Sequence, residues 1–396
     1  MPQLGDMSGE RRERVARVQA RMRGQDLDAL LVSDPANIFY LSGYNAWSFY
    51  TPQVLFVPAD GAPLIVMREM DANGAHRTAD LSGDAVLGYP ETLVHRPDAH
   101  PFDWIAAELR DRGFVTPGTR RIGYEGDAHF FPVRGFLALT RAWPHVDFVE
   151  SRELVNWVRL VKSDTEIELM RRAGAVASHA MLAGIAAIEA GAPQHELAAV
   201  IQAAQARGVP GAGGDYPAIV PMFPTGAGAD TPHLTWTSAP LVAGEAVAIE
   251  LAGVHQRYHA PLARTVTLGP ASADLDRVAG VTVDGLHAAL DAIRPGVTPA
   301  DVVGAWDWVL AANGLEKRSR LGYSIGVGYP PDWGERTVSL RADDHTELRE
   351  NMTFHVIAGM WMTGYGFETS ESVRVTASGV ELLTDVPREL IVRSGR

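Results

Sequence analysis

The chain has 396 residues, 46% of them hydrophobic, which is enough to bury the cores of two domains. It carries a net charge of -13 and has no basic block, which argues against nucleic acid as a partner. It contains no cysteine, which excludes disulfides, thiolate catalysis and cysteine-ligated metal sites.

The N-terminal segment does not have the pattern of a signal peptide. Residues 1–14 are polar and charged, without an apolar core. No apolar stretch of the sequence reaches the length of a membrane span. We therefore expect a cytoplasmic protein that has no membrane partner.

The first 150 residues alternate between helical and strand patterns. Ser8 is placed to cap a helix that carries Val15, Val18 and Met22 on one face and ends at Gly24. Strands are expected at 28–33, 54–58, 63–67 and 121–124, and a helix at 104–112. This alternation predicts an α/β domain with a parallel or mixed sheet.

An aromatic segment, residues 37–50, interrupts this domain and is too aromatic for an ordinary solvent-exposed loop. Its rings either cover the sheet of their own domain or form a wall over the pocket of another chain. Under the second interpretation Trp47 and Tyr50 close a substrate pocket.

The pattern changes near residues 151–161. Ser163 and Glu166 match a capping box at the start of a long amphipathic helix, so we place the domain boundary just before it. The predicted domains are 1–158 and 159–396. Later helices are expected at 195–207, 274–293 and 299–313, and strands at 246–251, 258–268, 352–359 and 371–375. This order predicts an α+β domain with its site on a curved sheet.

The most informative stretch of the sequence is 320–335, which we interpret as a functional loop between a helix and a strand. It contains four glycines, two prolines and Tyr323 near its start. Glycines allow close approach of a neighbour or ligand, and two consecutive prolines fix an extended path. An ordinary turn-rich connection is the alternative interpretation.

Titratable residues interrupt apolar or glycine-rich segments of the second domain. They are His233, Glu250, His355, Glu368 and Glu371. A carboxylate in a buried strand needs a cation, a hydrogen-bond network or a shifted pKa. Each residue alone could be structural, but together they indicate a shared site. No phosphate-binding loop ending in Lys-Ser/Thr and no His-Glu-x-x-His zinc motif occurs.

The whole chain resembles the pita-bread-fold group that includes Xaa-Pro peptidases, methionine aminopeptidase and creatinase. The matching segments are 231–233, 250–265, 321–326, 351–354 and 371–379. The resemblance implies a creatinase-type α/β N-terminal domain and an α+β pita-bread C-terminal domain.

The metal-ligand positions of those peptidases are changed in this sequence. The resemblance places Glu250, Pro261, Tyr323, Ile357 and Glu371 at the positions of two Asp, one His and two Glu. Proline and isoleucine offer no ligand oxygen, and two carboxylates with a phenol are too few for a dinuclear centre. We therefore expect no metal and no other cofactor.

Creatinase, which hydrolyses a C–N bond without metal, is the precedent within the group. In such an enzyme a cationic amidinium or guanidinium substrate can replace the lost metal ions between glutamates. Segments 34–37 and 47–50, 250–253 and 258–262, and 322–335 are similar to the ectoine hydrolases. Those enzymes open the cyclic amidine of ectoine to N-acetyl-2,4-diaminobutyrate.

The resemblance implies ectoine, and hydroxyectoine if it is tolerated, as the small-molecule substrate of a homodimer. The expected catalytic residues are His233, Glu250, Glu371 and Tyr323. The expected substrate-binding residues are Trp47, Tyr50, His259, Arg320, His355 and Glu335. Arg264 and Arg320 are both candidates to bind the substrate carboxylate. The sequence leaves open which glutamate attacks, or whether His233 activates a water.

Three alternatives remain at this stage. The chain could be a creatinase-like amidinohydrolase, which creatine would reveal. A peptidase would need a divalent metal and an Xaa-Pro substrate. A non-catalytic pita-bread protein would bind a ligand without converting it.

Overall fold

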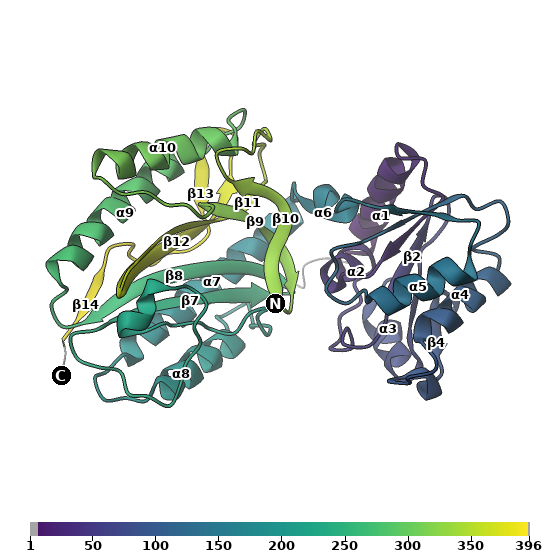
Figure 1. Cartoon of the computed structure of the whole chain (residues 1–396), viewed down its shortest axis with the longest axis horizontal. Coiled ribbons are helices and arrows are strands. Elements are labelled where there is room, and N and C mark those ends of the chain that lie inside the picture. Colours follow the sequence, from purple (N-terminus) through teal and green to yellow (C-terminus); the bar gives the residue numbers. More distant parts are fainter. Residues whose placement is uncertain (1–6, 395–396) are drawn as a thin grey trace. The chain divides into compact units, whose positions relative to one another are not determined.

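The computed structural model describes residues 7–394, and the chain divides into two compact domains between Arg159 and Leu160 (Figure 1). The sequence placed this boundary after residue 158. Each domain has its own sheet and its own apolar core.

The N-terminal domain is an α/β domain with a mixed six-stranded sheet. The strand order is β4-β3-β2-β1-β5-β6, in which β1–β2 and β2–β3 are antiparallel and the other neighbours are parallel. Its strands are β1 (Ala29–Val32), β2 (Val54–Pro58), β3 (Leu64–Arg68), β4 (Val86–Tyr89), β5 (Arg121–Tyr124) and β6 (Asp147–Glu150). Its helices are α1 (Ser8–Arg23), α2 (Pro35–Ser42), α3 (Ala72–Thr78), α4 (Pro101–Asp111), α5 (Val133–Ala142) and α6 (Leu154–Arg159).

Local sequence signals explain both ends of α2 and the buried face of α1. The Asp34 carboxylate accepts from the amides of Ala36 and Asn37, and Gly43 ends α2 with a φ of 80°. Val18 and Met22 of α1 are fully buried, as the helical spacing predicted. Ser8 is not the cap of α1, because it is the first helical residue and the helix has no side-chain cap.

The C-terminal domain is a pita-bread domain with a curled, largely antiparallel sheet. Its path is β13-β12-β11-β9-β8-β14, with β10 paired to β9 and β7 paired to β8. Its strands are β7 (Ala246–His255), β8 (Tyr258–Leu268), β9 (Gly322–Tyr329), β10 (Asp332–Leu340), β11 (Thr353–Met362), β12 (Tyr365–Val375), β13 (Val380–Leu382) and β14 (Ile391–Arg393). Its helices are α7 (Asp164–Ala187), α8 (Gln194–Arg207), α9 (Ala273–Ala292) and α10 (Pro299–Ala312).

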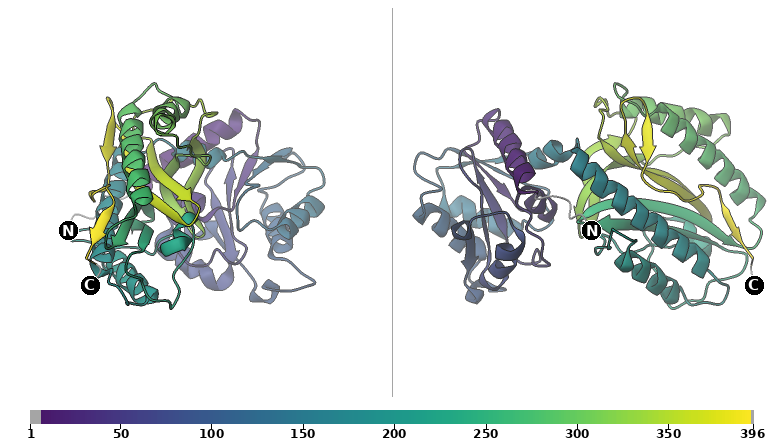
Figure 2. Two further views of the ribbon diagram at one scale, coloured as in Figure 1. Left: turned by 60° about the vertical axis from the view of Figure 1, so that its left-hand side comes forward. Right: turned by 180° about the vertical axis from the view of Figure 1, so that it is seen from behind.

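Helix α7 begins at the capping box that the sequence predicted and packs against β7 and β8 (Figure 2). The contact is close, because a β-carbon on Gly253 would lie 2.1 Å from the backbone of Ala173 and Ala177. Ile249 and Leu251 of β7 point into the core shared with α7 and α8. Residues that alternate with them, Glu250 among them, face the other side of the sheet.

The glycines and prolines of the stretch 320–335 had indicated a loop, and this prediction is wrong. Most of it forms β9 and the start of β10, joined at Pro330 and Pro331. The glycines permit close packing between strands, since a β-carbon on Gly322 would lie 2.3 Å from the carbonyl oxygen of His355. Within residues 7–394, no helix is both long enough and apolar enough to span a membrane.

Candidate active site

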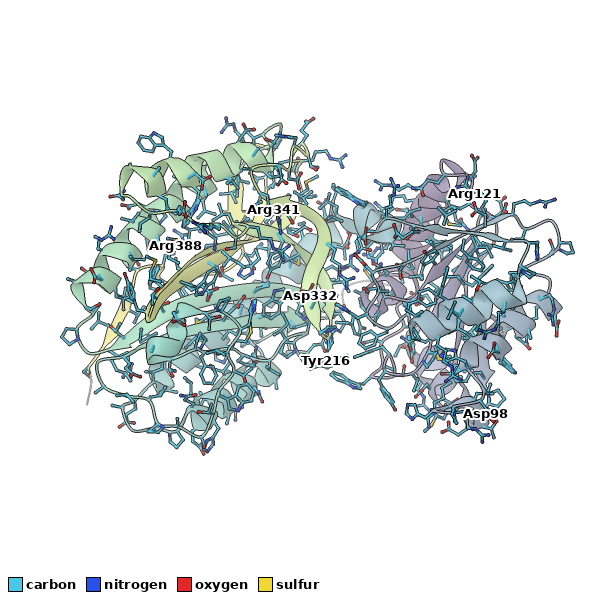
Figure 3. The ribbon with its side chains drawn as sticks, in the orientation of Figure 1. Asp98, Arg121, Tyr216, Asp332, Arg341 and Arg388 are labelled. Atoms are coloured by element: carbon cyan, nitrogen blue, oxygen red, sulfur yellow. The ribbon has the colours of Figure 1, made fainter. Side chains whose placement is uncertain are left out.

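The concave side of the C-terminal sheet encloses a cavity of about 490 Å³. Strands β7, β9, β10, β11 and β12 contribute to it, together with the segments before β7 and before β9. Asp332, the first residue of β10, is one of its lining residues (Figure 3). Its lining residues are Ile219, Met222, Pro232, His233, Glu250, Ser319, Arg320, Tyr323, Asp332, Trp333, Ile357, Trp361 and Glu368.

Two buried carboxylates, Glu250 and Glu368, line this cavity. They are 6% and 4% exposed. Burial raises the pKa of Glu250 well above its usual range, and the neighbouring charge of Glu368 raises it further. Burial also raises the pKa of Glu368 to about 7, against the opposing effect of Lys317. Two buried, neighbouring carboxyls do not both ionise easily, so the pair favours holding one proton between them.

Strand register explains why Glu368 faces the cavity and Glu371 does not. Glu368 pairs with Gly359 on β11, and Ser370 pairs with Ile357. These residues share the cavity face because side chains alternate along a strand. Glu371 is an odd number of residues from Glu368 and therefore points to the opposite face.

On that opposite face, Glu371 is held in a buried ion network. Its Oε1 accepts from Arg264 at 2.6 Å and from Arg388 at 2.9 Å, and its Oε2 accepts from the Thr384 hydroxyl at 2.6 Å. Arg388 lies between α9 and β12 (Figure 3). Both carboxylate oxygens are thus engaged by the protein. The structure does not bring Glu371 together with the cavity, and Arg264 is likewise committed to this network.

Tyr323 lines the cavity and belongs to a hydrogen-bonded chain. Its hydroxyl accepts from Trp333 Nε1 at 2.7 Å and lies 3.2 Å from His355 Nδ1. His355 Nε2 lies 2.7 Å from the Ser370 hydroxyl, which accepts from the Ala263 amide. Burial raises the pKa of Tyr323 well above its ordinary value and lowers the pKa of His355 to about 3. At neutral pH the phenol is therefore protonated and the imidazole is neutral.

The tautomer of His355 decides where the Tyr323 proton points. If Nδ1 carries the proton, His355 donates to Tyr323 and Ser370 donates to Nε2, so the phenol proton is free to point into the cavity. If Nε2 carries it, the Ser370 hydroxyl proton is left without an acceptor among the described residues. The first arrangement satisfies the whole chain and presents Tyr323 as a donor.

His233 and Arg320 stand at the rim of the cavity, and both are exposed. The Arg320 guanidinium lies 4.2 Å from the centre of the Tyr323 ring. His233 adopts a φ of 71°, in the left-handed region that non-glycine residues rarely enter. The sequence-predicted residues His233, Glu250, Tyr323 and Arg320 are thus brought to one cavity.

Glu335 and His259 lie outside the cavity lining and are engaged elsewhere. Glu335 forms a buried ion pair with Lys162 at 2.6 Å. His259 accepts from the Ala218 amide at 2.9 Å, and its other ring nitrogen lies 2.8 Å from the Arg257 carbonyl oxygen. Burial lowers the pKa of His259 well below its usual range. The Ala218–His259 contact attaches the segment before β7 to β8, and the Lys162–Glu335 pair attaches the segment before α7 to β10.

Trp47 and Tyr50 belong to the N-terminal domain, where they are 57% and 56% exposed. Phe39, Tyr40 and Phe49 of the same segment are buried in that domain. The first interpretation therefore holds for Phe39, Tyr40 and Phe49. A wall of Trp47 and Tyr50 over the pocket of another chain stays a prediction.

Trp333 and Trp361 are cavity residues that the sequence did not single out. Glu368 was named with the other titratable residues of a shared site, but it was given no catalytic or substrate-binding role. The predicted strand began at Glu371, whereas β12 begins at Tyr365. Because the predicted strand did not include Glu368, the sequence could not show on which face of the sheet this residue lies. The sequence does show that Glu368 and Ser370 are two residues apart and so share a face of the strand. Only the register with β11 shows that this face is the one that lines the cavity.

The sequence 322–326 has the letters Gly-x-Ser-x-Gly of a serine-hydrolase nucleophile elbow, but its structure differs. Ser324 lies within β9, is fully buried, and shares a hydrogen bond with Thr337. A nucleophile elbow places its serine on a sharp strand-to-helix turn at the site. Ser324 is therefore not such a nucleophile.

The cavity residues do not fit a metal centre. In the described part of the chain, no three His, Asp or Glu side chains converge so as to hold an ion. Across from Ile357 the cavity face presents Ser370 rather than Glu371. Hard divalent ions need several oxygen or nitrogen ligands, and Glu250 and Glu368 alone supply too few.

Comparisons with known proteins agree with this architecture. Residues 14–161 match the creatinase/prolidase N-terminal domain, and residues 168–377 match metallopeptidase family M24. The chain is 41% identical to an ectoine hydrolase of Halomonas elongata over 387 residues, covering 96% of both chains.

Two solved structures share the fold at low identity. Prolidase from Thermococcus sibiricus has a TM-score of 0.84 at 18% identity, covering 96% of this chain and 99% of its own. Prolidase from Pyrococcus horikoshii has a TM-score of 0.80 at 20% identity, covering 96% and 100%. From the family matches and the full-length relative, this chain belongs to the M24 family of hydrolases and carries a creatinase/prolidase N-terminal domain.

Proposed function

We propose that this protein hydrolyses the cyclic amidine ectoine to N-acetyl-2,4-diaminobutyrate without a metal ion. The observation that carries the proposal is the buried pair Glu250 and Glu368 in a cavity that does not fit a metal. A dry site with excess negative charge favours a cation, and an amidinium can donate two charge-assisted hydrogen bonds to such carboxylates. The 41% identity to an ectoine hydrolase supports ectoine as that cation.

The other residues that line the cavity suit the flat ring and the carboxylate of ectoine. Trp333, Trp361 and Tyr323 supply aromatic surface, which attracts a flat cation through its ring faces. Arg320 stands at the rim, where its guanidinium can bind the substrate carboxylate. In this pose the cationic end of ectoine points inward to the glutamates and its anionic end points outward.

Two chemical routes fit this arrangement, and both add one water without oxidation or reduction. In the first, a carboxylate oxygen of Glu250 bonds to C2 of the amidinium, a ring C–N bond breaks, and water then releases the glutamate. In the second, His233 accepts a proton from water while the water oxygen bonds to C2, and a ring C–N bond of the resulting adduct then breaks.

In either route the departing nitrogen must gain a proton. Tyr323 is placed to provide it, since the hydrogen-bonded chain leaves its hydroxyl free to donate into the cavity. Glu368 holds the positive charge of the amidinium during attack. The glutamate pair is thus Glu250 and Glu368, and Glu371 is left to its ion network.

A creatinase-like activity is the second candidate, because a guanidinium meets the same carboxylates. A panel of substrates separates the alternatives. Chelator-treated protein is incubated with ectoine, hydroxyectoine or creatine, and a proline dipeptide is tested with and without manganese. We expect conversion of ectoine. Conversion of creatine alone would favour the amidinohydrolase, cleavage of the dipeptide only with manganese would favour a peptidase, and binding without conversion would favour a non-catalytic protein.

We further propose that the protein acts as a homodimer in which Trp47 and Tyr50 close the site. Two large exposed aromatic side chains on one segment are typical of an interface. Replacing both by alanine should raise the KM for ectoine, and light scattering on both proteins reports the oligomer.

A further inference from the structure

Lys317 is one of only two lysines in a chain that has 33 arginines. It lies in the segment between α10 and β9, where its ammonium donates to the Gly359 carbonyl oxygen at 2.9 Å. It also lies 4.2 Å from the centre of the Trp361 ring. Burial lowers its pKa to about 8. A compact ammonium with a movable pKa is the property that distinguishes lysine from arginine.

Lys317 does not line the active-site cavity, but it contacts Gly359 and Trp361, which lie next to it or line it. Gly359, whose carbonyl it binds, is the cross-strand partner of Glu368. Trp361 lies across Gly359, since a β-carbon there would come within 2.6 Å of the indole ring. Trp361 and Glu368 line the 490 Å³ cavity, whereas Lys317 lines a separate cavity of about 210 Å³. Lys317 is therefore close to the carboxylate pair without contacting the proposed substrate.

The other titratable groups on the elements around Glu368 have partners of their own or lie on another face of the sheet. Glu250, on β7, is the second member of the pair. Arg264 of β8 is bound to Glu371 on the other face of β12, where Arg388 also contacts His287 of α9. On β11, His355 is neutral at ordinary pH. Asp230, from the turn Gly226–Asp230, accepts from the Gly364 amide. On β13, Glu381 pairs with Arg171 and Arg374. Arg320 and His233 stand at the rim of the same cavity, and Lys317 is the cation whose charge lowers the pKa of Glu368.

We propose that Lys317 is a positioning residue that fixes the resting negative charge of the pair on Glu368, so that Glu250 keeps the proton until a cation enters the cavity. The directions of the pKa shifts agree, because Lys317 opposes protonation of Glu368 whereas Glu368 favours protonation of Glu250. The positive charge of an entering amidinium stabilises the ionised form of Glu250 beside the ionised Glu368. Glu250 then loses its proton to solvent and becomes a carboxylate only when the substrate is present.

The use of this arrangement in ectoine hydrolysis rests on the proposed function, but the arrangement itself is a property of the free protein. Infrared titration of the carboxylic-acid carbonyl bands measures it without substrate, and the E250Q and E368Q variants assign the two bands. With Lys317→Met, we expect the Glu368 midpoint to rise by about one pH unit or more. Lys317→Arg should retain a midpoint close to that of the unmodified protein.

Arg341→Met is the matched control, because Arg341 lines the same smaller cavity (Figure 3) but is not among the charges that act on Glu368. Its midpoint should stay in place. An unchanged midpoint in folded Lys317→Met protein, or an equal shift in the Arg341 control, would overturn the proposal. Circular dichroism establishes that each variant is folded.

Acetamidinium tests the displacement of the Glu250 proton. Calorimetry in two buffers of different ionisation enthalpy, at a pH where the Glu250 band is present, should show release of about one proton per bound cation. The E250Q variant should release none. Binding without proton release would contradict the proposal.

Turnover of ectoine separates this inference from the proposed function. If the proposal holds, the acid limb of kcat/KM moves to higher pH in Lys317→Met by the same interval as the infrared midpoint, and not in the Arg341 control. Shifted midpoints in a protein that leaves ectoine unchanged would retain the role of Lys317 and reject the substrate. Hydrolysis of ectoine with an unmoved midpoint and acid limb in Lys317→Met would reject Lys317 alone.

Discussion

Glu368 and Glu371 lie three residues apart on one strand, and their surroundings give them opposite properties. Glu368 faces the cavity and has a pKa raised to about 7 by burial. Glu371 faces the other side and is neutralised by Arg264 and Arg388. A buried carboxylate without a full complement of donors is available to a ligand, whereas one bound on both oxygens is part of the framework.

Replacing each glutamate by glutamine separates these two roles. In Glu368→Gln we expect ectoine turnover to fall by at least about 100-fold, because the amidinium loses its anionic partner. Its melting temperature at neutral pH should be no lower than that of the unmodified protein. In Glu371→Gln we expect the unfolding free energy to fall by about 3 to 5 kcal/mol, since two arginines lose their counter-charge.

Kinetics with ectoine and chemical denaturation of both variants make the comparison. Turnover of Glu371→Gln should be largely retained below its melting temperature. If Glu371→Gln is stable but inactive while Glu368→Gln retains its activity, the assignment is reversed and the site must be rebuilt around the network of Arg264.

At the level of helices and strands, short sequence signals predicted the elements whose ends depend on neighbouring residues alone. The capping box at Ser163 and Glu166 is present, and β8 has the predicted bounds. Strand β12 begins at Tyr365 rather than at the predicted Glu371 because its first residues are fixed by pairing with β11. The stretch 320–335 is a strand pair because packing overrides the turn preference of its glycines. Such long-range pairing is not encoded in a short window.

Glycine at position 253 is an element-scale requirement for the contact between β7 and α7. Gly253→Ala should lower the unfolding free energy by several kcal/mol, because the new methyl group overlaps the helix backbone at 2.1 Å. Gly280→Ala, in α9, is the matched control. A β-carbon there meets no atom within 4 Å, so this change should stabilise the helix by up to about 1 kcal/mol.

Denaturation midpoints of the two alanine variants test the packing of the domain. Equal stability of both variants would show that α7 does not lie as close to β7 as described here. Expression level alone is not informative, because Gly253→Ala is expected to fold poorly at 37 °C.

At the scale of the whole molecule, the residues that the structure collects in one cavity come from segments more than 100 positions apart. The sequence identified four of them, His233, Glu250, Tyr323 and Arg320, because polar side chains stood out in apolar or glycine-rich settings. It named Glu368 among the titratable residues but could not assign it a role, and it could not identify Lys317, since their proximity depends on the curl of the sheet. Family resemblance likewise could not show which face of β12 each glutamate occupies.

The raised pKa of Glu368 also predicts how stability changes with pH. A carboxyl whose pKa is higher in the folded state binds more protons when folded, so its contribution to stability declines as pH rises toward about 7. Buried His259 and His355, whose pKa values are lowered, contribute with the opposite sign. The comparison of Glu368→Gln with the unmodified protein isolates the glutamate.

The stability of Glu368→Gln relative to the unmodified protein should therefore increase between about pH 5 and pH 7. Urea denaturation at a series of pH values measures this difference. A difference that is constant across the range would mean that Glu368 has an ordinary pKa, and the shared-proton description of the pair would fail.

We propose that a metal-free site with paired glutamates hydrolyses ectoine, and this activity can be measured directly. The most direct measurement is proton NMR of ectoine incubated with chelator-treated protein and followed over time. We predict that the methyl signal of N-acetyl-2,4-diaminobutyrate grows as ectoine disappears, and that manganese does not change the rate. Ectoine that stays unchanged, or that is converted only after manganese is added, would contradict the account.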